Sequence, residues 1–139
     1  MDGDAPITED EVRDLALGFF HALRAQSEWT AAVLFAGGAP LETWFCGALP
    51  LADLLSFHAA FAEERHTILE LSLQPAAGGR VRAVGEVEWE AVVRDSGAIV
   101  QAVLEEDWLI ERAEDGGVRF AAYRSAEIRY LPGSAMLEF

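Results

Sequence analysis

The chain has 139 residues, of which 52% are hydrophobic, and it carries a formal net charge of −14. This length suits one domain with one core, so we expect a single domain over residues 1–139, and the apolar content argues against disorder. So acidic a chain would be repelled by a phosphate backbone or an anionic membrane surface, and no apolar run is long enough to span a bilayer. We therefore expect neither nucleic acid nor membrane as a partner.

The N-terminal sequence and the cysteine content favour a reducing compartment. The N-terminal stretch "MDGDAPITED" lacks the basic-then-apolar order of a signal peptide. Cys46 is the only cysteine, which excludes an internal disulfide. We expect a cytoplasmic protein in which Cys46 is a small buried hydrophobic residue.

Helical patterns occupy the first part of the chain. Thr8 as N-cap and Glu11 three residues later form a capping box, and apolar residues follow at helical spacing from Val12 to Leu23. A second helix is expected over about 27–36, ended by "GGAP", and a short extended piece over "LETWFCG". "LADLLSFHAAFAEE", residues 51–64, predicts a third helix.

The apolar period then changes from helical to alternating. Strands are expected over 67–75, 80–94, 98–112 and 117–131, separated by "AAGG", "DSG" and "EDGG" turns. One face of the first strand is expected to consist of Thr67, Leu69, Leu71 and Leu73. Helices followed by an antiparallel meander indicate an α+β fold with the helices on one face of a twisted sheet.

The stretch "VLEEDWLIER" contains three consecutive acids inside an apolar strand. A strand alternates its faces, so one acid at least should point inward. If Ser96 and Gly97 form a two-residue loop, opposing residue numbers sum to 193 and every member of the inner face is apolar except Glu106. This register places Gly85 opposite Trp108, where the indole needs room, and turns Glu105 and Asp107 outward, toward Glu88 and Glu86.

A second register follows if Asp115 and Gly116 form the next turn. Glu106 then faces Ser125, Trp108 faces Tyr123, and Asp107 faces Arg124. A buried ionisable group is costly unless paired or neutralised, which makes Glu106 a functional candidate. The alternative is that Glu106 lies near a strand end, or bonds Tyr123 or Ser125, with no further role.

The order of helix, "AVLFAGGAPLE", helix and long antiparallel strands with "EEDWLIERAEDGGVRFAAY" resembles the nuclear transport factor 2-like superfamily, in its SnoaL-like polyketide cyclase and ketosteroid isomerase-type branch. The resemblance covers about residues 8–131. It implies a cone in which a strongly curved antiparallel sheet wraps the N-terminal helices around a deep apolar pocket. The lining it implies is Phe19, Phe35, Trp44, Phe57, Phe61, Trp89, Glu106, Trp108 and Tyr123, although each of these side chains could equally be core.

The resemblance also locates departures from the isomerase pattern. Thr43 stands where the catalytic carboxylate base would be, and Phe19 stands where the oxyanion-binding tyrosine would be. Glu106 falls in the region of the second, protonated oxyanion acid. The chain thus keeps a pocket acid but lacks the isomerase base and tyrosine, which argues against ketosteroid isomerase activity as such.

The resulting hypothesis is a binding protein for a largely apolar, cyclic small molecule. If it is an enzyme, Glu106 would be the general acid or base, assisted by Tyr123 or His58, in an isomerisation, cyclisation or dehydration. The alternative is a non-catalytic module that binds a ligand or serves in assembly. A second polar group aimed at the cavity would favour the enzyme, and a wholly apolar cavity would favour binding.

Further expectations concern histidine, metals and assembly. His58 shares a helix face with Leu54 and Phe61, where a satisfied core or rim histidine is the alternative to catalysis. "HAAFAEERH" does not place His58, Glu63 and His66 on one helical face, so neither a metal nor another cofactor is expected. The resemblance implies a homodimer through the outer sheet face.

Overall fold

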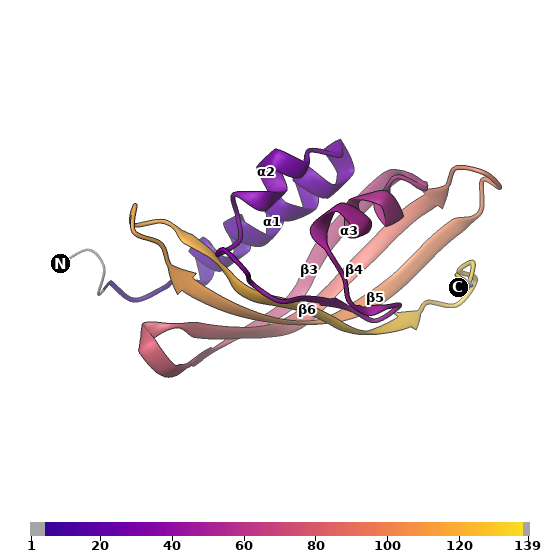
Figure 1. The fold of residues 1–139 in the computed structure, drawn as a ribbon. Helices are drawn as coiled ribbons and strands as arrows, with labels where there is room; N and C mark the ends of the chain where they lie inside the picture. Colours follow the sequence, from indigo (N-terminus) through magenta and orange to yellow (C-terminus); the bar gives the residue numbers. More distant parts are fainter. Residues whose placement is uncertain (1–4, 138–139) are drawn as a thin grey trace.

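The computed structural model describes residues 5–137 and shows three helices packed on one face of a curved six-stranded sheet (Figure 1). The helices are α1 (Glu9–Ala25), α2 (Glu28–Ala32) and α3 (Leu51–His58). The strands are β1 (Leu41–Thr43), β2 (Gly47–Ala48), β3 (Phe61–Pro75), β4 (Val81–Val93), β5 (Ile99–Arg112) and β6 (Val118–Tyr130), and a single 3₁₀ turn, Ala77–Gly79, joins β3 to β4. No helix in this part of the chain is long and apolar enough to cross a membrane.

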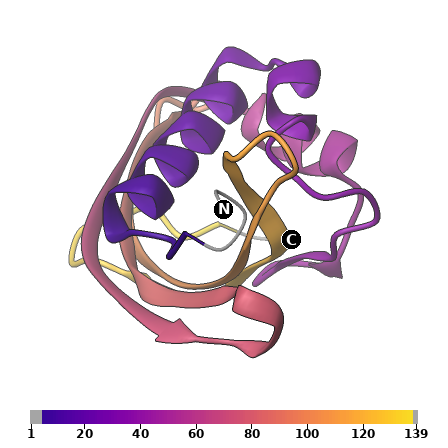
Figure 2. The same ribbon diagram turned by 90° about the vertical axis from the view of Figure 1, so that its left-hand side faces the viewer.

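The sheet has the strand order β2-β1-β6-β5-β4-β3. Strands β3 to β6 form the expected antiparallel meander, but β1 pairs with β6 in parallel, so the sheet is mixed and not purely antiparallel. Viewed from its end, the sheet curls around the helices, which cover its concave face (Figure 2). The fold is therefore the α+β cone that the sequence predicts.

Helix α1 begins as its capping box requires. The Thr8 hydroxyl accepts a hydrogen bond from the Glu11 backbone N–H, and the Glu11 carboxylate accepts one from the Thr8 backbone N–H. The predicted apolar stripe is buried, with Val12, Ala16 and Phe19 each at 0% exposure. This stripe is the helical half of the main core.

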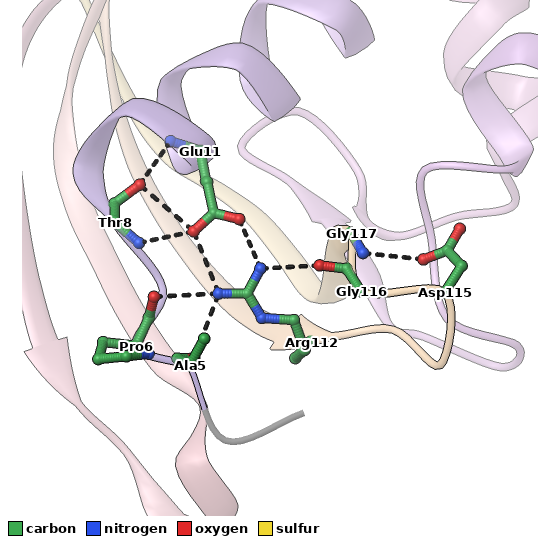
Figure 3. A network of polar contacts seen from close by, with 8 residues as sticks. All are labelled: Ala5, Pro6, Thr8, Glu11, Arg112, Asp115, Gly116 and Gly117. Atoms are coloured by element: carbon green, nitrogen blue, oxygen red, sulfur yellow. Dashed lines mark hydrogen bonds and ion pairs between the residues drawn. The ribbon is translucent and has the colours of Figure 1, made fainter. Parts of the chain in front are cut away.

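Arg112, at the end of β5, ties the start of the chain to the sheet (Figure 3). Its guanidinium donates hydrogen bonds to both carboxylate oxygens of Glu11 and to the backbone carbonyls of Ala5, Pro6 and Gly116. The side chain is only 12% exposed, so this fork of charge-assisted bonds holds the entry to α1 against β5.

Two predicted helices are shorter than expected. Helix α2 ends at Ala32, not near residue 36. Helix α3 ends at His58 and the chain enters β3 at Phe61, so the expected helix over 51–64 is wrong at its second half. There the backbone carbonyl of Ala60 accepts a hydrogen bond from Arg94 N–H, and Phe61 pairs with Val93. Pairing with β4 overrides a helical pattern that continues in the sequence.

The register between β4 and β5 differs from the prediction by two residues. Opposing numbers sum to 191, because residues 94–97 make a four-residue loop between Val93 and Ala98, with Gly97 at φ 73°. Gly85 therefore faces Glu106, not Trp108, while Glu105 faces Glu86 and Asp107 faces Val84. A shift of two preserves which face each residue occupies, so Glu106 still points inward.

The second register is confirmed at the residues that matter for the cavity. Glu106 faces Ser125, Trp108 faces Tyr123, and Asp107 faces Arg124. Near the turn itself Ala113 pairs with Gly117, leaving three loop residues where two were expected. An irregularity between Leu109 and Ile110 compensates for the extra residue.

The pairing of strand β3 with β4 has two irregularities that the sequence did not predict. One lies between Ala62 and Arg65 and the other between Ile68 and Glu70. The second turns Leu69 outward, to 49% exposure, and brings Ile68, Leu71 and Leu73 onto the core. The face predicted from Thr67 and Leu69 is thus wrong over its first half.

Candidate functional site

A cavity opens between the helices and the concave face of the sheet, at the boundary of two apolar clusters. One cluster joins α1 to the centre of the sheet, and the other gathers around Phe61 and Trp89. The cavity holds about 30 Å³ of free space, enough for about one or two water molecules. It is lined by Leu23, Thr43, Trp44, Phe45, Leu54, Phe57, His58, His66, Trp89, Leu104, Glu106, Tyr123 and Ser125.

Glu106 is the inward acid that the strand pattern predicts. It is 2% exposed, and its Oε1 accepts a 2.9 Å hydrogen bond from the Tyr123 hydroxyl, which itself is buried. Its Oε2 is buried without a hydrogen-bond partner among the described residues. A buried carboxyl oxygen without a partner is uncommon in proteins, and a bound ligand or water would satisfy it.

Burial raises the pKa of Glu106 to about 8. The hydrogen bond from the Tyr123 hydroxyl acts in the opposite direction, as do the nearby polar groups of Ser125 and Trp108, which make no hydrogen bond of normal geometry to Glu106, but desolvation prevails. Glu106 is therefore mostly protonated at neutral pH and can donate a hydrogen bond. Burial, and then the charge of Glu106, raise the pKa of Tyr123 well above its ordinary value, so the phenol stays neutral.

Two hydroxyl groups extend the polar lining beside Glu106. Ser125 lies directly opposite Glu106 on β6, and the parallel pairing of Glu42 with Arg124 places Thr43 next to Ser125 on β1. Thr43 and Ser125 are 7% and 6% exposed, and neither hydroxyl has a hydrogen-bond partner among the described residues. Three neighbouring strands thus present three unsatisfied oxygens to one cavity, which is not the wholly apolar lining expected of a simple apolar binding pocket.

His58 brings a second ionisable group to the cavity from the last turn of α3. Its Nδ1 lies 2.6 Å from Glu64 Oε2, and the same oxygen accepts a 2.9 Å hydrogen bond from the Trp89 indole N–H. His58 and Glu64 are 8% and 5% exposed. Glu64 is absent from the predicted site residues because position 64 falls within the helix expected over 51–64, and no glycine or proline near Glu63 signals the bulge that turns Glu64 inward.

His66 lines the cavity beside His58 and stacks on Phe20, with ring centroids 4.3 Å apart and planes at 9°. Burial lowers the pKa of His66 to about 3, and the charges of His58 and Arg24 act in the same direction. His66 is therefore neutral at any physiological pH and serves as an aromatic wall.

The other predicted features fall outside the cavity. Cys46 is exposed, not buried as expected, because it lies in the turn between β1 and β2. Among residues 5–137, no group of three or more His, Cys, Asp or Glu side chains is arranged to hold a metal ion. On the outer face, Asp107 binds Arg82 at 2.6 Å, and this hydrogen bond lowers the pKa of Asp107.

Comparison with known proteins identifies the fold. No protein-family model and no curated protein sequence matches the chain. A solved hexachlorocyclohexane dehydrochlorinase (LinA Type2) superposes with a TM-score of 0.72 at 14% identity, over 93% of this chain and 92% of that chain. The LinA-type3 dehydrochlorinase from Novosphingobium barchaimii LL02 gives 0.70 at 14% identity, over 93% of each chain. A ketosteroid isomerase-like protein from Erwinia carotovora atroseptica SCRI1043 gives 0.62 at 15% identity, over 85% and 95%.

This is the nuclear transport factor 2-like fold. Six of the ten predicted site residues line the cavity: Trp44, Phe57, His58, Trp89, Glu106 and Tyr123. The remaining four do not: Phe19, Phe61 and Trp108 are buried in the surrounding core, and Phe35 packs edge-on against Phe19. Thr43, the position of the missing isomerase base, lines the cavity as a buried hydroxyl.

Proposed function

We propose that the cavity binds a neutral, largely apolar, cyclic small molecule and moves a proton beside a carbonyl group of that molecule. The observation that carries the proposal is the unpartnered Oε2 of a protonated Glu106 in the same cavity as His58. A neutral carboxyl donates a hydrogen bond to a carbonyl oxygen and stabilises the negative charge that develops there. An imidazole can take the proton from the neighbouring carbon.

The proton transfer needs no reactant other than the ligand and the side chains of the cavity. An imidazole nitrogen of His58 accepts a proton from the carbon beside the carbonyl, and Glu106 Oε2–H hydrogen-bonds to the oxygen, which becomes an enol or enolate. In a β,γ-unsaturated ketone, return of the proton from His58 to the γ carbon completes an isomerisation. In a β-hydroxy ketone, the β-hydroxyl group takes this proton and leaves as water, which completes a dehydration. Tyr123 holds Glu106 through Oε1, so Oε2 remains directed to the ligand.

The charge of the lining selects against anions. No arginine is among the described lining residues, and His66 is neutral. His58 already faces the Glu64 carboxylate and the whole chain carries −14, so a carboxylate or phosphate ligand would enter without a free counter-charge. The dehydrochlorinase among the similar structures is named for a cyclic, uncharged substrate, which supports the same class for this cavity.

A ligand the size of a ring exceeds the free space of the cavity, so the wall must give way. Trp44 and Phe45 come from the connection between β1 and β2, a ribbon paired at only two positions. Phe45 stacks on Phe57 with ring centroids 4.3 Å apart. Outward movement of the turn between β1 and β2 would enlarge the cavity while breaking few backbone pairs.

The aromatic walls of the cavity, among them Trp44, Phe57 and Trp89, also suit a second candidate, a non-catalytic ligand-binding module. The test uses 2-tetralone, an apolar cyclic ketone, and measures deuterium exchange of its α-protons in D₂O by NMR. Exchange above the buffer rate that is lost in Glu106→Leu and retained in Glu105→Gln supports the enzyme. Binding of 2-tetralone with exchange at the buffer rate contradicts catalysis and supports the binding module. Failure to bind contradicts both forms of the proposal for this ligand class.

A further inference from the structure

Glu64 reaches the interior because of a local defect in β3. A regular alternation from Phe61 inward would bring Glu63 and Arg65 to the inner face and turn Glu64 out. The irregularity between Ala62 and Arg65 inserts one residue, so Glu63 and Arg65 are exposed and Glu64 is buried. Glu63 adopts φ 52°, a left-handed conformation that is costly for a residue other than glycine. Backbone strain of this kind persists where the surrounding structure needs it.

The carboxylate delivered by this bulge is held from two sides. Glu64 Oε2 accepts hydrogen bonds from the Trp89 indole N–H and from His58 Nδ1. An indole nitrogen can only donate, and a carboxylate can only accept. With Glu64 ionised, the hydrogen of the 2.6 Å contact lies on His58 Nδ1, and in the neutral form of the imidazole Nε2 then carries the lone pair.

The charged and titratable groups around His58 come from every element packed on it. Glu64 and His66 come from β3, and the His66 ring centroid lies 6.0 Å from that of His58. Arg24, on α1, donates to the backbone carbonyl of Glu64 at 3.5 Å and lies beside His21. Glu106 and Tyr123 line the cavity from the sheet. Glu64 is the only one of these groups that is hydrogen-bonded to the His58 ring among the described residues.

We propose that Glu64 is a positioning residue, which fixes His58 in the Nδ1–H tautomer and leaves Nε2 as the proton acceptor for the ligand. The proposal rests on the proposed function, because it specifies which atom acts as base there. Glu64 does not line the cavity, so it would act through His58. The strained backbone at Glu63 would then serve to place Glu64 beside His58. The pair follows the general logic in which a buried carboxylate orients an imidazole and selects its tautomer.

The decisive measurement is the ¹⁵N spectrum of the histidine side chains in the full chain without ligand. The chain has three histidines, so replacing each in turn assigns the signals. We expect neutral His58 to show a protonated Nδ1 and an unprotonated Nε2 in the wild type. In Glu64→Ala this signature should be lost in favour of the Nε2–H form that free histidine prefers. Glu70→Ala, the same change at an exposed position of β3, should leave the His58 signals unaltered.

The outcomes separate this proposal from the proposed function. An Nε2–H tautomer in the wild type overturns the role of Glu64 even if 2-tetralone exchange depends on Glu106, and it does so without any variant having to fold. Where exchange is observed, Glu64→Ala should slow it about 10- to 100-fold at unchanged ligand affinity, as expected for loss of a residue that orients a histidine. An unchanged exchange rate in a folded Glu64→Ala variant would also overturn the role of Glu64, while leaving that of Glu106 intact.

Discussion

The Tyr123 hydroxyl donates a 2.9 Å hydrogen bond to Oε1 of Glu106, and both groups are buried. The contact joins neighbouring strands on the concave side of the sheet and leaves Oε2 of Glu106 free of protein partners among the described residues. The carbonyl oxygen of a neutral carboxyl is a better acceptor than its hydroxyl oxygen, so the hydrogen bond from Tyr123 to Oε1 favours the proton of a neutral Glu106 on Oε2. The phenol thereby directs the acidic hydrogen toward the cavity.

Removing this hydroxyl should change the titration of Glu106 in a definite direction. The hydrogen bond from Tyr123 lowers the pKa of Glu106, so Tyr123→Phe should raise that pKa above its value of about 8. Side-chain carbon NMR across a pH series measures the shift. Tyr130→Phe removes the other tyrosine hydroxyl, which binds the backbone of Leu137, and should not affect Glu106. A lower pKa in Tyr123→Phe would show that the hydrogen bond is not the one described.

The inward direction of Glu106 could be predicted because an error of two residues in register does not change which face of the sheet a side chain occupies. The loop between β4 and β5 holds four residues where two were expected, and the shift of two leaves every side chain on its face. In the β5–β6 hairpin an extra turn residue and a later irregularity cancel, so Trp108 still meets Tyr123. Parity is encoded by every residue of a strand, whereas register depends on one turn.

The position of Glu64 could not be predicted because a bulge reverses parity. The sequence around Glu63 has no glycine or proline to mark the defect, and the apolar spacing of Phe57, His58 and Phe61 continues as a helix would. The third helix ends because the chain pairs with β4, a contact between residues far apart in sequence. The half of the candidate site that β3 provides therefore depends on tertiary structure.

Gly85 offers a test of the second bulge in β3. A Cβ built on Gly85 would lie 2.1 Å from the backbone carbonyl oxygen of Glu70, so the glycine is required by that close approach and not by the Trp108 indole. Even Gly85→Ala should destabilise the protein, by about 1–3 kcal/mol, because a sheet backbone cannot easily move aside. Chemical denaturation measures the change.

Gly18→Ala is the matched control for Gly85→Ala. Gly18 lies inside α1, and its added Cβ would meet only Leu34 Cδ1, at an ordinary 3.8 Å. The alanine should stabilise the protein by about 0.5–1 kcal/mol through its lower conformational entropy in the unfolded chain. Equal effects of the two substitutions would contradict the close contact at Gly85.

We also predict a homodimer through the outer sheet face. Four glutamates, Glu70, Glu86, Glu105 and Glu127, lie opposite one another across β3 to β6 on that face. Within one subunit Arg129 binds Glu86 at 3.0 Å. A dimer through this face requires arginines of each subunit to lie against the acids of the other. The dimer should weaken in high salt and at low pH. Sedimentation that shows a monomer at tens of micromolar, neutral pH and low salt would rule it out.

Arg112 should be irreplaceable by lysine at the entry to α1. A lysine has a single ammonium group, which cannot serve Glu11 and the carbonyls of Ala5, Pro6 and Gly116 together. Arg112→Lys should cost about 1–3 kcal/mol of unfolding free energy. Arg13→Lys, at an exposed pair with Glu9, should cost far less. The two unfolding curves at neutral pH decide between a structural clamp and a replaceable surface charge.

The clamp also has a pH dependence of known sign. The hydrogen bond from Arg112 lowers the pKa of Glu11, so the linked stability is present at neutral pH and is lost as pH falls through the folded-state value. The difference between the wild type and Arg112→Lys should therefore shrink in acid. A difference that grows in acid would show that Glu11 is not the partner that matters.

Glu106 should show the opposite pH dependence. Its pKa rises from 4.5 to about 8 on folding, so the protonated form favours the fold. Below pH 4.5 the burial of Glu106 does not reduce the free energy of unfolding. As the pH rises from 4.5 to about 8, this free energy falls progressively. Glu106→Gln keeps the shape and an oxygen for Tyr123 but cannot ionise. It should be more stable than the wild type by about 2–4 kcal/mol at neutral pH, and the gain should vanish near pH 4.

Glu105→Gln is the matched control for Glu106→Gln, since it makes the same substitution at the adjacent, exposed residue of β5. It should change stability only by the small amount expected of a surface charge. Urea unfolding of both variants from pH 4 to pH 9, with NMR titration of the wild-type carboxyls, makes the comparison. If the two variants give the same curves and Glu106 titrates like a free glutamate, then Glu106 is charged at neutral pH. It could not then donate a hydrogen bond to a ligand carbonyl, and the proposed proton transfer would lose its acid.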